Sequence, residues 1–101
     1  MFQKLKQYKD LRDQSKKMKT TLEKETIHAD AAGGKVAVVM DGNQKILSID
    51  IDESLLNPKY KTTVEVGVKD AIEGAMKKLQ RMMLEKMKSG EIEMPDLSKL
   101  S

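Results

Sequence analysis

The 101-residue sequence contains no cysteine, no tryptophan, one histidine and only three aromatic residues, Phe2, Tyr8 and Tyr60. The absence of cysteine excludes disulfides and thiolate metal sites, and it is consistent with a reducing compartment. Because aromatic residues are so few, apolar burial depends on Val, Ile, Leu and eight Met. A domain of this size buries a modest share of its surface, so we expect it to share a core with a second copy.

Long hydrophobic runs are also missing. No apolar run approaches the roughly 20 residues that a membrane-spanning helix needs. The first residues also lack the apolar segment of a signal peptide. We therefore expect a cytoplasmic protein with no membrane partner.

The charge of the chain is unevenly distributed around a net value of +3. Residues 1–25 hold eight basic against four acidic residues, residues 26–57 hold two against five, and residues 58–101 hold nine against seven. The two ends are basic and the middle is acidic, which indicates that the terminal segments face any anionic partner.

Apolar residues recur at steps of three and four between Leu5 and Leu22, without any Gly or Pro. This spacing predicts a helix with a narrow apolar stripe, similar to a coiled-coil seam, that ends near Lys24. The stripe consists of Leu5, Tyr8, Leu11, Met18 and Leu22, with Ser15 at the one missing position.

From Thr26 the apolar period becomes two, in three segments separated by glycine-containing turns. This pattern predicts three antiparallel strands. We expect Gly33-Gly34 and Gly42-Asn43 to supply the positive φ angles of the two turns. One face of the sheet needs a cover. The alternating apolar residues are Ile27, Ala29, Ala31, Val36, Val38, Met40, Leu47, Ile49 and Ile51.

Asn57-Pro58 is typical of an N-cap followed by the first helical residue, and Gly90 is typical of a helix end. Apolar residues between them recur at steps of three and four, which predicts a second, longer helix. The small residues Gly67, Ala71 and Gly74 predict close approach of another backbone. The residues expected in the core or the dimer contact are Leu47, Ile49, Ile51, Val68, Ile72, Met76 and Leu79.

The predicted fold class is therefore α+β, with the order helix, three-stranded meander, helix (α-β-β-β-α). One domain would cover residues 1–90. Residues 91–101 contain Pro95 and show no clear period, so we expect a flexible tail there.

Few residues are suited to catalysis or metal binding. His28 would have to act without a cysteine or a second imidazole, so we interpret it as an exposed strand residue. Asp50, Asp52 and Glu53 could hold a hard cation, which would suit a small metal-dependent enzyme. The more common role for Asp52 is to cap a short turn over Glu53–Leu56. We expect no enzymatic activity, no metal, no cofactor and no small-molecule substrate.

Basic residues on the first helix form a row. Lys9, Arg12, Lys16 and Lys19 follow at steps of three and four, with Lys17 beside them, and such a row can follow phosphates along a groove. A solvated outer face, with Asp13 and Lys17 as a helical pair, explains the same residues, and for an isolated helix it is the commoner explanation.

On the second helix, Glu65 with Lys69 and Glu73 with Lys77 are spaced as helical ion pairs. The candidate phosphate contacts there are instead Lys78, Arg81, Lys86 and Lys88. The lack of aromatic platforms disfavours a single-stranded partner, and no base-reading helix is evident, so low sequence specificity is expected.

Methionines on the second helix permit another hypothesis. Met76, Met82, Met83 and Met87 lie at helical spacing among Leu and Ala, which is more typical of a core or a dimer contact than of a promiscuous binding surface. The alternative function is a protein-interaction or chaperone-like adaptor that uses these apolar stripes.

The order of the elements, together with residues 31–56 (AAGGKVAVVMDGNQKILSIDIDESLL), resembles the YbaB/EbfC family of bacterial nucleoid-associated proteins. The matching features are the Gly33-Gly34 turn, the Val36–Val38 strand, Gly42, and Ile49–Asp52 followed by Ser54–Leu56. The chain lacks the Gly- and Met-rich lead-in of many members.

The resemblance implies a homodimer in which strands of the two subunits associate and helices project like tweezers. It also implies binding of double-stranded DNA by the projecting helices and a role in nucleoid organisation. With the resemblance added, we favour DNA contact over simple solvation for the two rows of cations.

Overall fold

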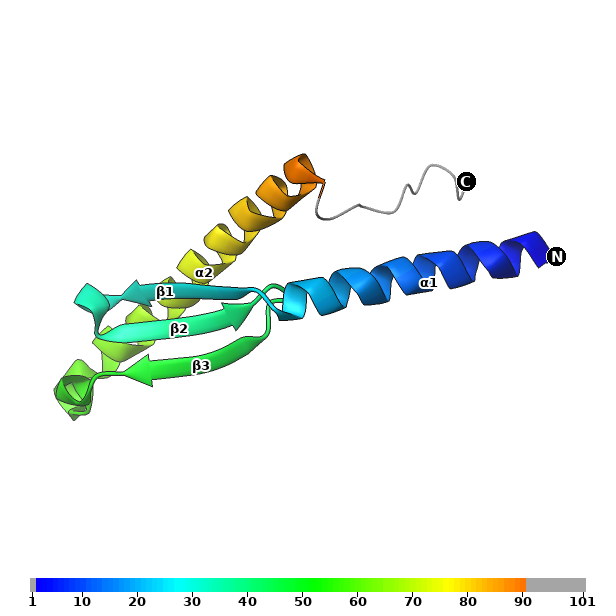
Figure 1. Ribbon diagram of the computed structural model, residues 1–101. Helices are drawn as coiled ribbons and strands as arrows, with labels where there is room; N and C mark the ends of the chain where they lie inside the picture. Colours follow the sequence, from blue (N-terminus) through cyan, green and yellow to red (C-terminus); the bar gives the residue numbers. More distant parts are fainter. Residues whose placement is uncertain (1, 91–101) are drawn as a thin grey trace.

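The computed structural model describes residues 2–90, with side chains from Arg12 onward, as a helix, a three-stranded antiparallel sheet and a second long helix (Figure 1). This order confirms the predicted α-β-β-β-α class. No helix within the described range is long and apolar enough to cross a membrane. The expected flexible tail at residues 91–101 lies outside the described residues. The elements are α1 (Phe2–Glu23), β1 (Thr26–Ala31), β2 (Val36–Asp41), β3 (Ile46–Ile51) and α2 (Lys61–Ser89).

The helix α1 projects beyond one end of the sheet and is attached at its last turn (Figure 1). The last carbonyls of a helix need partners outside it. The turn between β2 and β3 supplies two of them: the Gly42 N–H donates to the Leu22 carbonyl at 2.9 Å, and the Asn43 Nδ2 donates to the Lys19 carbonyl at 2.9 Å. The Leu22 side chain is buried at this joint. The sheet therefore fixes where α1 begins to project.

The two turns of the meander use glycine for different reasons. Gly33 and Gly34 have positive φ, as predicted. In the second turn the positive φ belongs to Gln44, so the prediction for Gly42-Asn43 was wrong. Gly42 is required for space instead, because a Cβ there would lie 2.6 Å from the Leu22 carbonyl oxygen.

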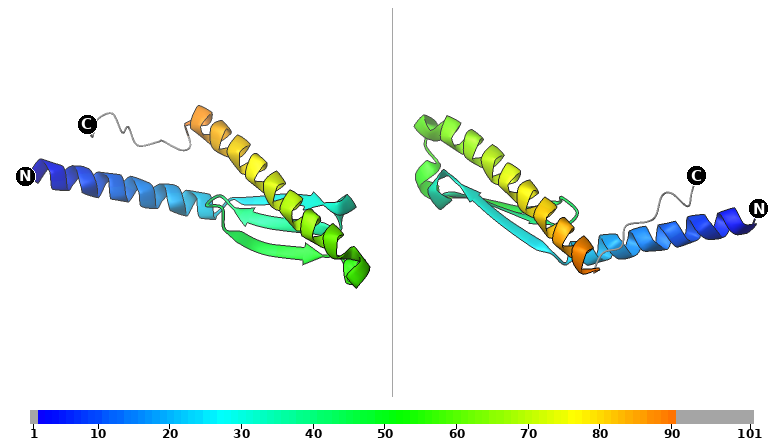
Figure 2. Two further views of the ribbon diagram at one scale, coloured as in Figure 1. Left: turned by 180° about the vertical axis from the view of Figure 1, so that it is seen from behind. Right: turned by 90° about the horizontal axis from the view of Figure 1, so that it is seen from above.

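The helix α2 runs across one face of the sheet and packs on β1 and β2 (Figure 2). Small residues allow this close approach: a Cβ on Gly67 would lie 3.0 Å from Val36 Cγ2, and Ala71 is fully buried. This is the close packing that the small residues predicted, with the sheet as the neighbour. The buried residues form two clusters, Ile27, Ala29, Met40, Ala75 and Leu79, and Val36, Val38, Leu55 and Ala71.

The strand β3 is covered less well than its neighbours. In register, Ile51 lies opposite Val36 and Ile49 lies opposite Val38, so both face the side that α2 occupies. A register shift after Val39 leaves Leu47 as an extra residue. Ile51 is half-buried, but Ile49 and Leu47 are 46% and 48% exposed. An apolar strip thus remains open along this edge.

The chain between β3 and α2 consists of two short 3₁₀ turns, Glu53–Leu55 and Pro58–Tyr60. Asp52 caps the first turn, as expected, by accepting from the Ser54 N–H at 2.8 Å. Asn57 caps the second turn, so the prediction that it starts the long helix directly was wrong: α2 begins only at Lys61. Gly90, with φ of 79°, ends α2 as predicted.

Candidate nucleic-acid interface

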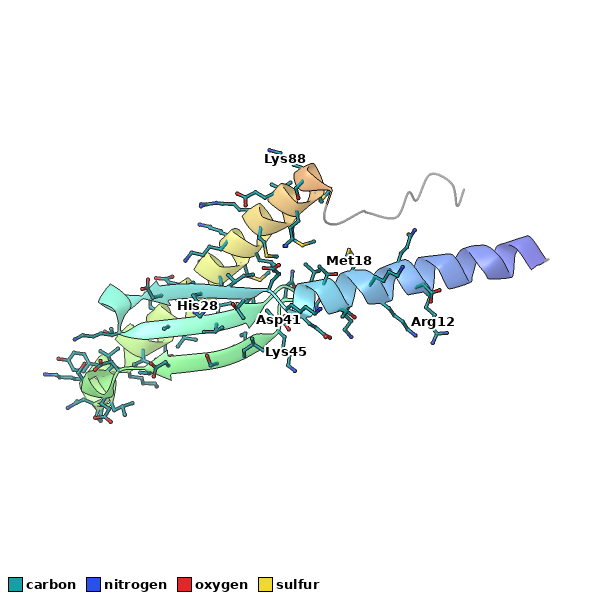
Figure 3. The ribbon with its side chains drawn as sticks, in the orientation of Figure 1. Arg12, Met18, His28, Asp41, Lys45 and Lys88 are labelled. Carbon is teal, nitrogen blue, oxygen red and sulfur yellow. The ribbon has the colours of Figure 1, made fainter. Side chains whose placement is uncertain are left out.

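Four cations on the projecting helix are exposed. The four are Arg12, which Figure 3 labels on the projecting part of α1, and Lys16, Lys17 and Lys19; they are called the α1 cations below. Among the side chains described, from Arg12 to Gly90, the charged groups of these four residues form no hydrogen bond or ion pair with protein groups. Lys9 belongs to the same helix, but its side chain is outside that range. The α1 cations are therefore available to an external anion.

Two of the four candidate cations on α2 are engaged by the protein itself. The Lys78 Nζ donates to the His28 carbonyl at 2.5 Å. The Lys86 Nζ lies 2.7 Å from Glu25 Oε1, and its side chain is only 14% exposed. Both lysines link α2 to β1 or to the residues that precede it. Their charges thus serve the fold, which the sequence pattern did not indicate.

The other two candidates on α2, Arg81 and Lys88, are exposed. Lys88 lies near the end of α2, on an arm separate from α1 (Figure 3). The last turns of α2 and the projecting α1 lie at the same end of the sheet and diverge (Figure 1). The exposed cations therefore occupy two arms rather than one continuous row.

The ion pairs expected within the helices do not form. Among the described residues, Asp13 and Lys17, Glu65 and Lys69, and Glu73 and Lys77 are not in salt-bridge contact, and all six residues are exposed. Exposed pairs of this kind contribute little, since solvent screens them and the side chains lose entropy when held together. Sequence spacing therefore predicted the wrong state for the lysines of α2: within the described range Lys69 and Lys77 are not paired as expected, whereas Lys78 and Lys86 have protein partners.

Lys45 is a cation that the sequence analysis missed. It is exposed in the turn between β2 and β3, at the base of α1 (Figure 3). Its backbone N–H donates to the buried Asp41 carboxylate, which also accepts from the Asn43 N–H. Because Asn43 holds α1, the same turn positions Lys45 beside that helix. Its place in an acidic stretch of sequence concealed this.

The acidic candidates do not converge. No group of three or more His, Asp or Glu side chains suited to a metal ion is present in the part of the chain that the structure describes. Asp50 is exposed, and His28 is exposed on β1 as predicted. The hydrogen bonds from the Ser54 side chain and the Ser54 backbone lower the pKa of Asp52, which is consistent with its capping role.

The four candidates on α2 for the core or the dimer contact lie in the core or against it. Leu79 is buried, and Val68, Ile72 and Met76 pack against the two core clusters. Met82 and Met83 also pack on the core, whereas Met87 and Leu84 are 43% and 56% exposed. Leu84 also lines a shallow, mainly apolar hollow together with Gly42, Gln44, Leu79, Gln80 and Met83.

Comparisons with known proteins agree on one family. A family model described as the YbaB/EbfC DNA-binding family matches residues 1–93. A nucleoid-associated protein of Syntrophobacter fumaroxidans is 31% identical over 86 residues, which cover 85% of this chain and 78% of the relative. A nucleoid-associated protein of Beijerinckia indica subsp. indica is 34% identical over 93 residues, which cover 90% of this chain and 92% of the relative.

The fold also has a counterpart among solved structures. The crystal structure of an uncharacterized protein from Helicobacter pylori superposes with a TM-score of 0.62 at 17% identity. The match covers 77% of this chain and 90% of the other. It supports the fold, and the family match extends over nearly the whole sequence. The chain therefore belongs to the YbaB/EbfC DNA-binding family.

Proposed function

We propose that this protein binds double-stranded DNA as a homodimer, through the phosphate backbone and with low sequence specificity. The observation that carries the proposal is the row of unpaired α1 cations on a helix that projects beyond the sheet. Membership of a DNA-binding family supports it. By analogy with relatives named nucleoid-associated proteins, we place the protein in the cytoplasm on the nucleoid, where it organises DNA and thereby influences gene expression.

The α1 cations suit phosphates better than bases. They include three lysines, which act as point charges, and consecutive residues of a helix advance about 1.5 Å, so the row can lie along a phosphate strand. Contacts of this kind position a protein on DNA without reading its sequence. Arg81, Lys88 and Lys45 would add contacts from the second arm and the base. Lys78 and Lys86, already bound to the protein, would contribute less.

A homodimer would form most readily through the open edge of β3. Alternate residues of an antiparallel strand direct their backbone groups to opposite sides. Asp52 donates its N–H to the Lys35 carbonyl on the β2 side, so Ile49 and Ile51 direct theirs outward. The exposed Leu47 and Ile49 side chains line the same edge. A second copy would pair with these groups and cover these side chains.

The test of DNA binding is a triple substitution with a matched control. Changing Lys16, Lys17 and Lys19 to Ala should lower affinity for unrelated duplexes by a similar factor, at least about tenfold, because each lysine that binds a phosphate contributes a sequence-independent term. The control changes the exposed Lys59, Lys61 and Lys69 to Ala, an equal change of charge at the other end of the molecule. If both variants lost affinity equally, net charge alone would explain the loss, which would contradict the proposal.

The test of the dimer is a charge at its proposed edge. Ile49→Lys should reduce the mass measured by sedimentation to that of one chain, because the lysines of two copies would meet across the interface. Ser48→Lys is the control, since Ser48 is also exposed but directs its backbone groups toward β2. A dimer that survives Ile49→Lys would rule out the β3 edge.

The adaptor function is a second candidate, favoured by the apolar hollow that the exposed Leu84 lines and by the exposed Met87 on the same helix. Such a surface suits an apolar helix of a protein partner. Leu84→Glu should then abolish capture of one defined protein after nuclease treatment and leave duplex affinity unchanged. If Leu84→Glu removes no partner, the adaptor function is rejected.

A further inference from the structure

The two outer strands of the sheet both have an open edge. The order β1-β2-β3 leaves β1 and β3 with backbone groups that β2 does not use, and such edges invite pairing with another chain. The Asp41 N–H donates to the Lys45 carbonyl, toward β3. By alternation, Val39 also directs its backbone groups toward β3.

His28 is therefore on the free side of β1. It lies opposite Val39 in the register, and since Val39 directs its groups away from β1, the His28 N–H and carbonyl point away from β2. Lys78 extends from α2 over this edge, and its Nζ donates to the His28 carbonyl. An ammonium group and its four-carbon stem thus occupy the acceptor that an added strand would use.

The edge of β3 has no such obstruction. Ile49 directs its N–H and carbonyl outward, yet among the described residues no side chain donates a hydrogen bond to the backbone of Ile46–Ile51. The edges differ in side chains as well. Ile49 and Leu47 are exposed on β3, whereas the exposed residues of β1 are Thr26, His28 and Asp30.

We propose that Lys78 blocks the β1 edge, so that strand pairing between copies occurs only at β3 and stops at two. This inference rests on the proposed dimer and adds what limits its size. Pairing through one edge is self-complementary and closed. If β1 were open as well, each dimer would expose two further edges and could extend into a chain of dimers. Lysines at edge strands commonly prevent such growth.

The test compares the masses of three variants across a range of concentrations. Lys78→Met keeps an apolar stem but removes the donor, and it should form species of at least about twice the wild-type mass at high concentration. Lys78→Arg keeps donors and should retain the wild-type mass. Lys77→Met is the control: it removes the same charge from an exposed residue with no partner among the described residues. Identical masses for Lys78→Met and wild type would overturn the inference.

A second background separates this inference from the proposed dimer. In Ile49→Lys, which disables the β3 edge, adding Lys78→Met should raise the mass above that of Ile49→Lys alone, because the newly opened β1 edges can pair. An unchanged mass would refute the role of Lys78, whatever the wild-type mass is. A wild-type protein that sediments as one chain would refute the dimer alone. Far-ultraviolet circular dichroism of each variant verifies that it is folded.

Discussion

The two long helices carry similar cations but are held by the protein in different ways. α2 buries Ala71, Ala75 and Leu79 against the sheet, and its Lys78 and Lys86 bind the protein. α1 is attached at its last turn, and the side chains of the α1 cations have no protein partner among the described residues. Some cations of α2 thus stabilise the fold, whereas the described cations of α1 remain available to a ligand.

The largest expected difference between the helices is in stability. Leu79→Ala should lower the free energy of unfolding by about 2–5 kcal/mol, since it leaves a cavity under α2. Arg12→Ala, on the exposed surface of α1, should change it by less than about 0.5 kcal/mol. Urea titration followed by circular dichroism measures both. Comparable losses of stability would mean that α1 contributes to folding as α2 does.

The joint between α1 and the sheet should be the next most sensitive feature. Gly42→Ala places a Cβ 2.6 Å from the Leu22 carbonyl oxygen, so the turn or the helix must move, at a cost of about 1–3 kcal/mol. DNA affinity should fall too, because α1 is displaced.

Gly74→Ala is the control for this substitution. Its Cβ would meet only Ala29 Cβ, at an ordinary 3.6 Å. The free energy of unfolding should rise by about 0.5–1 kcal/mol, because alanine makes the unfolded chain less flexible than glycine does. Urea titration measures the stability of the two variants, and a duplex-binding assay measures their DNA affinity. Equal stability of the two variants would contradict a tightly packed joint.

A smaller effect should separate the bound from the free lysines of α2. Lys86→Ala should lower stability by up to about 1 kcal/mol through loss of its ion pair with Glu25, with little change in DNA affinity. Lys88→Ala should lower DNA affinity and leave stability nearly unchanged, since Lys88 is exposed near the end of α2. If both substitutions weaken DNA binding equally, the division between structural and ligand-binding cations fails.

The smallest effect concerns Asp52, which caps the short turn after β3 and belongs to neither helix. Hydrogen bonds from Ser54 lower the pKa of Asp52 in the folded state, so its carboxylate stabilises the fold above the usual titration range of a carboxyl group. That contribution disappears as the pH falls through the lowered pKa. Asp52→Asn should therefore be slightly less stable than wild type at neutral pH and equal to it in acid. A difference that grows in acid would contradict the assignment.

Much of the fold could be predicted because its signals are local. The change of apolar period at Thr26 marked the first strand, and Gly90 marked the end of α2. What failed depended on tertiary contacts. Gly42 looked like a turn glycine, but the nearby Leu22 carbonyl is the reason for it. Asn57 caps a short turn ahead of α2 instead of the helix itself.

The candidate site was harder to predict for the same reason. Spacing paired Lys77 with Glu73 and left Lys78 free, whereas the structure leaves Lys77 exposed and places Lys78 on the His28 carbonyl, 50 residues away in sequence. Spacing within one helix does not reveal which neighbour lies across from it. The α1 cations avoided this difficulty because, among the described residues, no protein group binds their side chains.

The central claim, that the α1 cations bind phosphates, is tested most directly by the salt dependence of duplex affinity. The logarithm of the association constant should fall linearly with the logarithm of the salt concentration, with a slope of about −0.9 for each phosphate bound. When Lys16, Lys17 and Lys19 are changed to Ala, the slope should become less steep by about one unit for each of these lysines that binds a phosphate. A slope near zero in the wild type, or the same slope in both proteins, would contradict the claim.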